Sequence, residues 1–166
     1  AFWDGAALYF CKRSNGDPGG TTGIDVCGHE MTHGVTQETS GLEYAGESGG
    51  INESLSDIMG KSVQFWTNPS VPKNWYISNA MNWLIRNMAN PNEFQNPDTY
   101  KGTYWKDKNP EVHTISGVGN YMFYLLTSGG SGTNDRGFNF SVNGIGLTKA
   151  DKIIYRSNLL YLFPKA

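Results

Sequence analysis

The sequence contains no apolar run that approaches the about 18 residues from which a membrane-spanning helix is inferred. It also lacks a large excess of either charge: it has 13 Lys and Arg residues and 15 Asp and Glu residues, for a formal net charge of -2. This balance argues against nucleic acid or an anionic membrane surface as a main partner. The chain has no N-terminal export pattern and opens on Ala1-Phe2-Trp3, so we expect any export signal or pro-segment to have been removed already.

Cysteine is scarce, with Cys11 and Cys27 as the two representatives. An even number of cysteines in a secreted protein is commonly paired, so we predict a disulfide between the N-terminal residues and the first long helix. Two buried free thiols are the alternative. Cys27 is not expected to bind a metal with His29, because residues two apart on a helix point to different faces.

Histidine is nearly as rare, and two of the three histidines lie in His29-Glu30-Met31-Thr32-His33. Residues four apart lie on one face of a helix, so both imidazoles can face one metal ion. This is the H-E-x-x-H pattern, in which the histidines bind zinc and the glutamate is the general base. The pattern also arises by chance on solvated helices, so a second feature is needed to support a metal site.

A second polar segment, Gly49–Asp57, supplies that feature and predicts the start of another helix. A catalytic zinc ion keeps three protein ligands and one open position, and Glu53 is the expected third ligand beside His29 and His33. Asp57 lies four residues later on the same face, where its carboxylate can accept the second ring N–H of a zinc-bound histidine. We therefore predict one zinc ion held by His29, His33 and Glu53.

The remaining pattern predicts a mainly helical α+β chain in one domain of 166 residues. Residues 1–24 are expected to form a β-hairpin, turning at Asp4-Gly5, and a loop, and residues 25–166 a helical subdomain. Thr148 and Asp151 resemble a capping box. The expected helices cover residues 25–39, 50–66, 79–88, 116–128 and about 148–163, with a weak strand over residues 138–142.

Taken together, these segments resemble the thermolysin-like family of secreted neutral zinc metalloproteases, the gluzincin type with a downstream glutamate ligand. The resemblance runs from residue 1 to about residue 164. It implies a helical zincin-type catalytic core, with the flanking lobes of the family truncated on both sides. The matching segments are Ala1–Gly5, Gly23–Val26, His29–Thr36, Ser40–Tyr44, Glu47–Glu53, Ser56–Gly60 and Val112–Val118.

The resemblance implies roles for further residues. Glu30 matches the base that activates the zinc-bound water for attack on the scissile carbonyl. Tyr44 and His113 match the two donors of hydrogen bonds to the developing oxyanion. An aspartate five residues upstream orients that histidine in the family, and this chain has lysine there. We expect Asp107 to take over the role, although Glu111 is also close.

Substrate binding is implied in the same way. Arg86 matches the arginine that holds a substrate carbonyl, and Ala1 matches the edge-strand residue that pairs with an extended substrate. The asparagine that precedes this position in the family is absent. Val26, Ile77, Met81 and Ile85 are the expected walls of an apolar specificity pocket, which implies cleavage before a bulky apolar residue.

The resemblance also bears on calcium as a second possible metal. The family has a double calcium site with several carboxylates, of which Asp25 is present here. The other matching positions hold neutral residues, Gln64, Asn74, Tyr76 and Asn79. Because Ca²⁺ prefers several carboxylate or carbonyl oxygens, we predict that the double site is lost or weak.

The resemblance thus predicts a secreted, extracellular zinc metalloendopeptidase that acts on proteins or peptides. An inhibitor, a pro-segment or a second chain that completes the cleft is a further expected partner. Two alternatives stay open: a non-catalytic zinc-binding fragment of such a protease, and a thermolysin-like fold used as a binding or inhibitory module. The presence of Glu30, Tyr44 and His113 argues against the second.

Overall fold

The computed structural model describes residues 1–11, 23–70, 72–78 and 84–165. Helices dominate this part of the chain and three small antiparallel hairpins accompany them, so the predicted mainly α, α+β class is confirmed. The helices are α1 (Ile24–Glu38), α2 (Gly46–Thr67), α3 (Val112–Ile115), α4 (Gly117–Ser128), α5 (Leu147–Leu160) and the 3₁₀ helix η3 (Pro91–Phe94). The strands are β1 (Phe2–Trp3), β2 (Leu8–Tyr9), β3 (Tyr76–Ile77), β4 (Arg86–Asn87), β5 (Gly130–Thr133) and β6 (Asn139–Val142).

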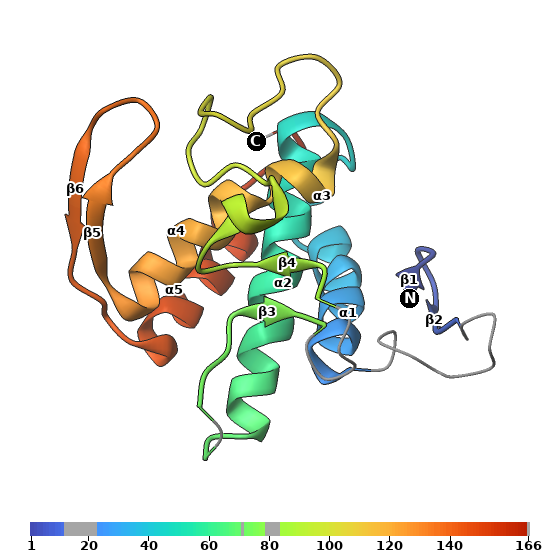
Figure 1. Cartoon of the computed structure of the whole chain (residues 1–166). Coiled ribbons are helices and arrows are strands. Elements are labelled where there is room, and N and C mark those ends of the chain that lie inside the picture. The colour runs from blue at the N-terminus through green and yellow to red at the C-terminus, as the bar shows by residue number, and fades with distance from the viewer. Residues whose placement is uncertain (12–22, 71, 79–83, 166) are drawn as a thin grey trace.

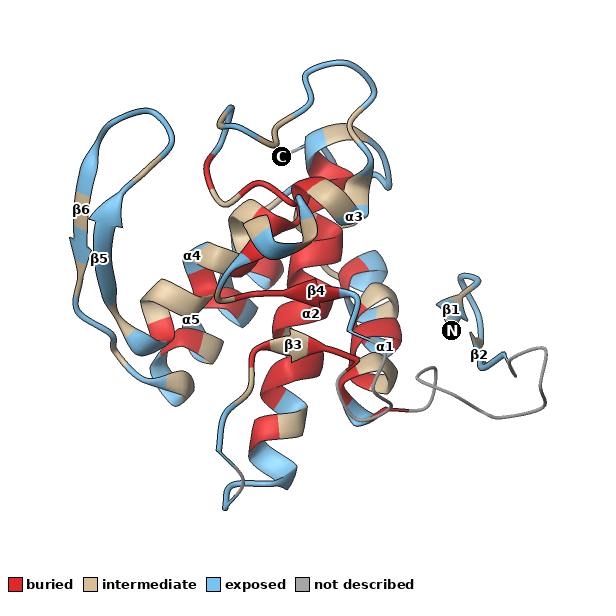
Figure 2. Cartoon of the chain, in the orientation of Figure 1, coloured by how far each residue is buried: buried red, intermediate tan, exposed pale blue. Residues whose placement is uncertain are grey.

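Helix α2 is the centre of the molecule. Figure 1 shows it between α1 on one side and α4 and α5 on the other, with the β3–β4 hairpin across its face. Its residues Leu55, Ile58 and Phe65 pack in the core with Phe123 of α4 and Ile154 of α5. Most of α2 is buried as a result (Figure 2), and a helix buried nearly all round can hold polar groups away from water.

Two glycines let α1 and α2 approach closely. A Cβ atom added to Gly60 would lie 2.2 Å from the carbonyl oxygen of Asp25, and one added to Gly28 would lie 2.9 Å from the Cα of Gly60. No side chain fits at such distances without a shift of the backbone. This contact brings the His29–His33 segment of α1 against the middle of α2.

The N-terminal hairpin lies beside α1 (Figure 1). Its turn is stabilised by Asp4, whose Oδ1 accepts hydrogen bonds from the backbone N–H groups of Ala6 and Ala7. The indole of Trp3 donates to Gln37 Oε1 on α1 at 3.0 Å. The predicted hairpin at residues 1–11 is therefore confirmed, and it forms one wall over the face of α1.

Several predicted elements are corrected. The predicted helix over residues 79–88 is wrong where the chain is described, because Arg86 and Asn87 form strand β4 paired with β3; residues 79–83 lie outside the described residues. No strand is predicted at residues 130–133, but they form β5, which pairs with β6. Pairing between strands decided both segments, and local composition does not report such pairing.

Two details at helix ends also differ. The capping box of Thr148 and Asp151 is not formed: α5 begins after Gly146, and Asp151 accepts hydrogen bonds from Ser62 Oγ (2.6 Å) and Trp66 Nε1 (3.2 Å) on α2. Helix α2 begins at Gly46, four residues earlier than predicted. In both cases contacts between elements outweigh the local signal.

The predicted disulfide is not present. Cys11 and Cys27 are both described, and no disulfide joins them. Cys27 is half-buried on α1, and this burial raises the pKa of its thiol. Among the helices in the described ranges, none is both long and apolar enough to cross a membrane.

Candidate active site

The three predicted metal ligands meet at one point between α1 and α2. Ligand atoms of His29, His33 and Glu53 all lie within 4.8 Å of one another. The Nε2 atoms of the two histidines are 3.1 Å apart, and each lies 3.4 Å from an oxygen of Glu53. One turn of α1 separates the two histidines, and the close approach of α2 brings in the carboxylate.

The other ring nitrogen of each histidine is already engaged. His29 Nδ1–H donates to Asp57 Oδ1 at 2.8 Å, and His33 Nδ1–H donates to the amide oxygen of Asn52 at 2.8 Å. With Nδ1 protonated, the lone pair of Nε2 is directed at the common point. The structure thus places Asp57 as predicted. Asn52, directly before Glu53, was not singled out from the sequence, because an amide next to a ligand carries no specific signal.

The site is electrostatically prepared for a cation. Burial favours the neutral ring of His29, but Asp57 and Glu53 outweigh it and raise its pKa to about 9. Burial likewise raises the pKa of Glu53, but the hydrogen bond and charge of His29 outweigh it and lower the pKa to about 2. The pKa of His33 is lowered by burial and by the neighbouring His29. Glu53 is therefore ionised at neutral pH and favours a positive charge beside it, which a proton on His29 supplies here and a cation held by the two rings would supply in its place.

The donor set fits a zinc ion. Glu53 Oε2 is buried and has no hydrogen-bond partner, which is costly unless a cation binds it. Two imidazoles and one carboxylate are a ligand combination found at catalytic zinc sites with an open fourth position. A zinc ion between the two imidazole nitrogens and Glu53 would give this buried oxygen the partner that it lacks.

Arg86 lies behind this group rather than in the open. Its Nε and Nη2 atoms each donate to a carboxylate oxygen of Asp57 at 2.7 Å, and Nη2 is 3.9 Å from Glu53 Oε2. Asn120 on α4 donates a further hydrogen bond to Asp57 at 2.8 Å. Burial would raise the pKa of Asp57, but Arg86 and His29 hold it well below the usual range. The guanidinium therefore anchors the carboxylate that orients His29.

A cavity of about 620 Å³ opens beside the ligand group. Glu30 is buried at its edge, whereas Tyr44 is 54% exposed. The Tyr44 hydroxyl donates a hydrogen bond to Glu53 Oε1 and lies 3.4 Å from His113 Nε2. Burial and this hydrogen bond raise the pKa of Tyr44, so the phenol stays protonated as a donor. The lining includes Ala1, Trp3, Glu30, Gln37, Tyr44 and His113 besides the ligand group.

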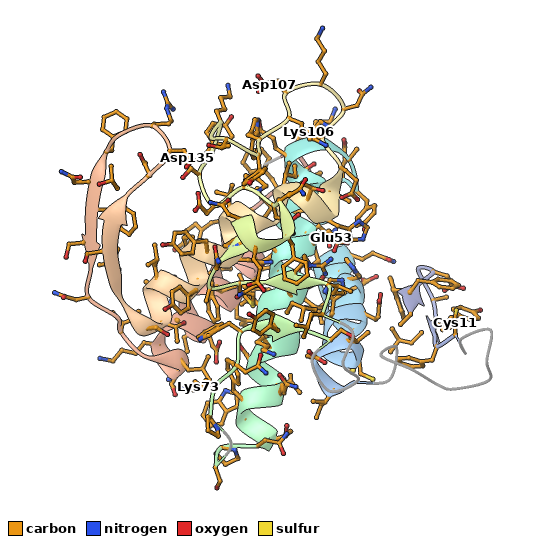
Figure 3. All side chains as sticks on the ribbon, viewed as in Figure 1. Cys11, Glu53, Lys73, Lys106, Asp107 and Asp135 are labelled. Atoms are coloured by element: carbon orange, nitrogen blue, oxygen red, sulfur yellow. The ribbon has the colours of Figure 1, made fainter. Side chains whose placement is uncertain are left out.

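Asp107 is not the partner of His113. It accepts a hydrogen bond from the indole of Trp105, and Figure 3 shows it on a loop at the edge of the molecule. Glu111 takes that place, with Oε1 2.5 Å from His113 Nδ1. Its Oε2 accepts from the backbone N–H of Thr114 at 2.8 Å, which caps α3. Glu111 reaches the ring because it directly precedes the turn of α3 that carries His113, whereas Asp107 is hydrogen-bonded to Trp105.

Glu111 gives a prediction with a matched control. Glu111→Gln should lower hydrolysis about tenfold, since a capping carboxylate that also holds the His113 ring is replaced by an amide. Asp107→Asn makes the same chemical change on the acid expected from the sequence and should leave the rate unchanged. The measurement is kcat/KM of both variants on one peptide. Equal rates for both would contradict this assignment.

Where they are described, the residues expected to line the apolar specificity pocket do not gather at this cavity. Among the described residues, neither Val26 nor Ile85 lines the cavity beside the ligand group. Ile85 is 37% exposed, Ile77 is buried in the core, and Met81 lies outside the described residues. Ala1 does line the cavity. Val26 and Ile85 therefore do not line this cavity, and the apolar specificity pocket stays a prediction.

Comparisons with known proteins point to one family. A family described as "Thermolysin metallopeptidase, alpha-helical domain" matches residues 40–166, and "Thermolysin metallopeptidase, catalytic domain" matches residues 1–37. Thermostable neutral protease NprT of Geobacillus stearothermophilus is 40% identical over 99% of this chain and 30% of its own length. Gelatinase of Enterococcus faecalis is 37% identical over 100% of this chain and 31% of its own length.

A solved structure is also similar. The precursor of protealysin, a metalloproteinase from Serratia proteamaculans, aligns with a TM-score of 0.64 at 27% identity. The alignment covers 88% of this chain and 48% of that one. The chain spans about 30% of the length of the curated relatives that it matches. On sequence and fold together, the chain belongs to the thermolysin metallopeptidase family.

Proposed function

We propose that the chain is the catalytic core of a zinc metalloendopeptidase that hydrolyses peptide bonds in proteins or peptides. The observation that carries this is the buried group of His29, His33 and Glu53, with an unpartnered Glu53 oxygen, beside a cavity that also holds Glu30. A zinc ion bound there would act as a Lewis acid and lower the pKa of water.

The protein's own groups divide the remaining work. Glu30 lines the cavity and is the proposed base that takes a proton from the attacking water and passes it to the leaving amine. Tyr44 and His113 converge on one side of the cavity, with 3.4 Å between hydroxyl and Nε2, where both can donate to a developing oxyanion. Asp57 holds the ring of His29, and Arg86 holds Asp57.

Substrate and setting follow from the family. We infer that an extended substrate runs along the N-terminal hairpin at Ala1, with a bulky apolar side chain after the scissile bond. Arg86 is proposed to reach a substrate carbonyl with the part of its fork that faces away from Asp57. Residues 1–166 are taken as one catalytic core, because residues 1–5 and both long helices line the same cavity. We place the protein outside the cell, with a pro-segment or inhibitor as a further partner.

A non-catalytic zinc-binding fragment is the second candidate. The observation in its favour is the small share of the curated relatives that this chain spans, about 30% of their length. Over the described N-terminal residues, one two-stranded hairpin forms the wall opposite the helices. A substrate needs a stable edge to pair with, and a second polypeptide could supply the rest of that wall.

The deciding experiment compares zinc binding with turnover. The 166-residue chain is loaded with one equivalent of zinc, and hydrolysis of a blocked Gly-Leu or Gly-Phe peptide is followed with and without chelator. Turnover that chelator abolishes supports the catalytic core. Stoichiometric zinc binding without turnover overturns it in favour of the zinc-binding fragment, and absence of zinc binding overturns both.

A further inference from the structure

A lysine side chain is completely buried in the middle of the molecule. Lys61 of α2 is 0% exposed and is the largest fully buried side chain among the described residues. Its ammonium donates a hydrogen bond to the carbonyl oxygen of Tyr76 at 2.5 Å and lies 3.8 Å from Asp25 Oδ2. The ring of Phe65 is 5.5 Å from the nitrogen. Buried ammonium groups are rare and need a charged partner.

Three elements meet at this ammonium. Asp25 comes from α1, Lys61 from α2, and the carbonyl of Tyr76 from β3. Asp25 is 1% exposed, and its Oδ2 also accepts the backbone N–H of Ser78 at 2.8 Å. Asp57, on the same helix as Lys61, adds a second negative charge to the surroundings of the ammonium. The carboxylate and the ammonium together connect β3 to both long helices.

The same location is where the resemblance implies calcium, and these residues do not fit it. Ca²⁺ takes six to eight oxygen ligands at about 2.3–2.6 Å. Asp25 is the one acid at the matching positions, and its Oδ2 is already shared by Lys61 and Ser78. Asn74 Oδ1 accepts the backbone N–H of Tyr76. A divalent cation would also meet the positive charge of the ammonium directly.

We propose that Lys61 is itself the cation of this site, so that its ammonium neutralises Asp25 and clamps β3 onto α1 and α2 without calcium. The proposal does not depend on peptidase activity, since the cluster contains no zinc ligand. It concerns how the chain satisfies a buried carboxylate.

The ionisation of Lys61 agrees with this role. Burial lowers its pKa to about 8, against the pull of Asp25 and Asp57. The side chain therefore remains charged at neutral pH. Because this pKa is below the usual 10.5, the unfolded chain binds more protons between about pH 8 and 10.5. Stability arising from this group alone rises with pH through that window, so burial of the charge is unfavourable and is offset only in part by Asp25 and Asp57.

The clamp has a structural consequence for the zinc side of the molecule. Strand β3 pairs with β4, with Ile77 opposite Arg86. Arg86 in turn holds Asp57, which holds His29. By holding β3, the ammonium of Lys61 also helps to hold β4 and its Arg86. Arg86 in turn fixes the Asp57 carboxylate that orients the zinc ligand His29.

The first test is thermal unfolding of the one-zinc protein, freed of other metals, with and without about 10 mM calcium chloride, which is above the affinity range of extracellular calcium sites. We expect no change in Tm. A calcium site filled at about 100 times its Kd would instead raise Tm by about 5–10 °C, and such a shift would overturn the proposal.

The second test is a pair of lysine variants. Lys61→Met leaves Asp25 buried without a counter-charge and should lower Tm by on the order of 10 °C. Lys73→Met is the matched control: its ammonium lies 5.9 Å from the same Phe65 ring but is exposed near the end of α2 (Figure 3), and its Tm should not change. Equal shifts for both variants would contradict the clamp.

A double variant keeps the test decisive if Lys61→Met fails to fold. Asp25→Asn with Lys61→Met removes both charges at once, and a neutral pair can replace a buried ion pair with little loss. We expect the double variant to fold and to unfold at a higher temperature than Lys61→Met or Asp25→Asn alone. Additive losses from the two substitutions would mean that the charges do not interact, contrary to the proposal.

Discussion

Replacement of Glu30 by Gln is expected to reduce peptide hydrolysis on the order of 10²–10⁴-fold, the range of a lost general base. Gln keeps the shape of Glu but cannot take up a proton. Glu30 lines the cavity and is not one of the three ligands, so zinc binding should be unchanged. The measurement is kcat/KM on a blocked Gly-Leu peptide together with the zinc stoichiometry of the same preparation.

The matched control for this experiment is Glu38→Gln. Glu38 lies on the same helix α1 but is exposed, and its Oε1 contacts only the neighbouring Gln37 among the described side chains. The control loses the same charge from the same helix and should keep the wild-type rate. Activity of Glu30→Gln within tenfold of the control would exclude Glu30 as the base and direct attention to another proton acceptor in the cavity.

Asp57→Asn should have the largest effect on the folded state. Asp57 is 0% exposed and accepts hydrogen bonds from His29, from two nitrogens of Arg86 and from Asn120. An amide has one acceptor oxygen, and its NH₂ group would face donors. It would also leave the buried guanidinium of Arg86 with the Glu53 carboxylate, 3.9 Å away, as its remaining counter-charge. Breaking a buried ion pair in this way costs about 3–5 kcal/mol.

Zinc binding should weaken in the same variant. Loss of the partner of a ligating histidine typically costs about 10–100-fold in metal affinity. Urea unfolding and competition against a metal indicator measure the two effects separately. Asp107→Asn is the control, because Asp107 is exposed and contacts Trp105. If Asp57→Asn bound zinc as tightly as this control, Asp57 would have no role in orienting His29.

A combined substitution separates the ion pair from the metal effect. In Asp57→Asn with Arg86→Met, no charge is left buried without a partner, so the loss of stability should be smaller than the sum of the two single losses. Zinc affinity should remain reduced, because His29 still lacks its acceptor. Recovery of zinc affinity along with stability would show that the effect on the metal was indirect.

Residues near one another in sequence were predicted well. The two histidines of α1 share a face because four residues separate them, and Asp57 follows Glu53 by the same spacing on α2. Helical periodicity carries this information directly. The long helices α1, α2 and α4 were predicted within a few residues of their ends.

Contacts across space were predicted poorly. Asp107 is expected from the sequence because it lies next to the position of the family's aspartate. In the structure, the turn of α3 brings Glu111 and not Asp107 to His113. The segment around Arg86 was predicted as helix, but pairing with β3 makes it a strand. Asp151 is expected from the sequence to cap a helix, but in the structure it accepts hydrogen bonds from Ser62 and Trp66 of α2 instead. For Arg86 and Asp151 the partner comes from another element, and local propensity does not specify that partner.

The sequence by itself predicts the metal-ligating group of His29, His33 and Glu53, the proposed base Glu30 and the main helices, because the spacing within α1 and within α2 puts these residues on one face of each helix. Tertiary structure alone decided that Arg86 secures Asp57, that Glu111 holds His113, and that Lys61 lies beside Asp25. These pairs join residues on different elements or around a tight turn. Arg86 and Lys61 are buried and need a counter-charge once the helices pack, whereas Glu111 and His113 are exposed and meet through the turn at the start of α3. The order of residues in the chain does not show these partners.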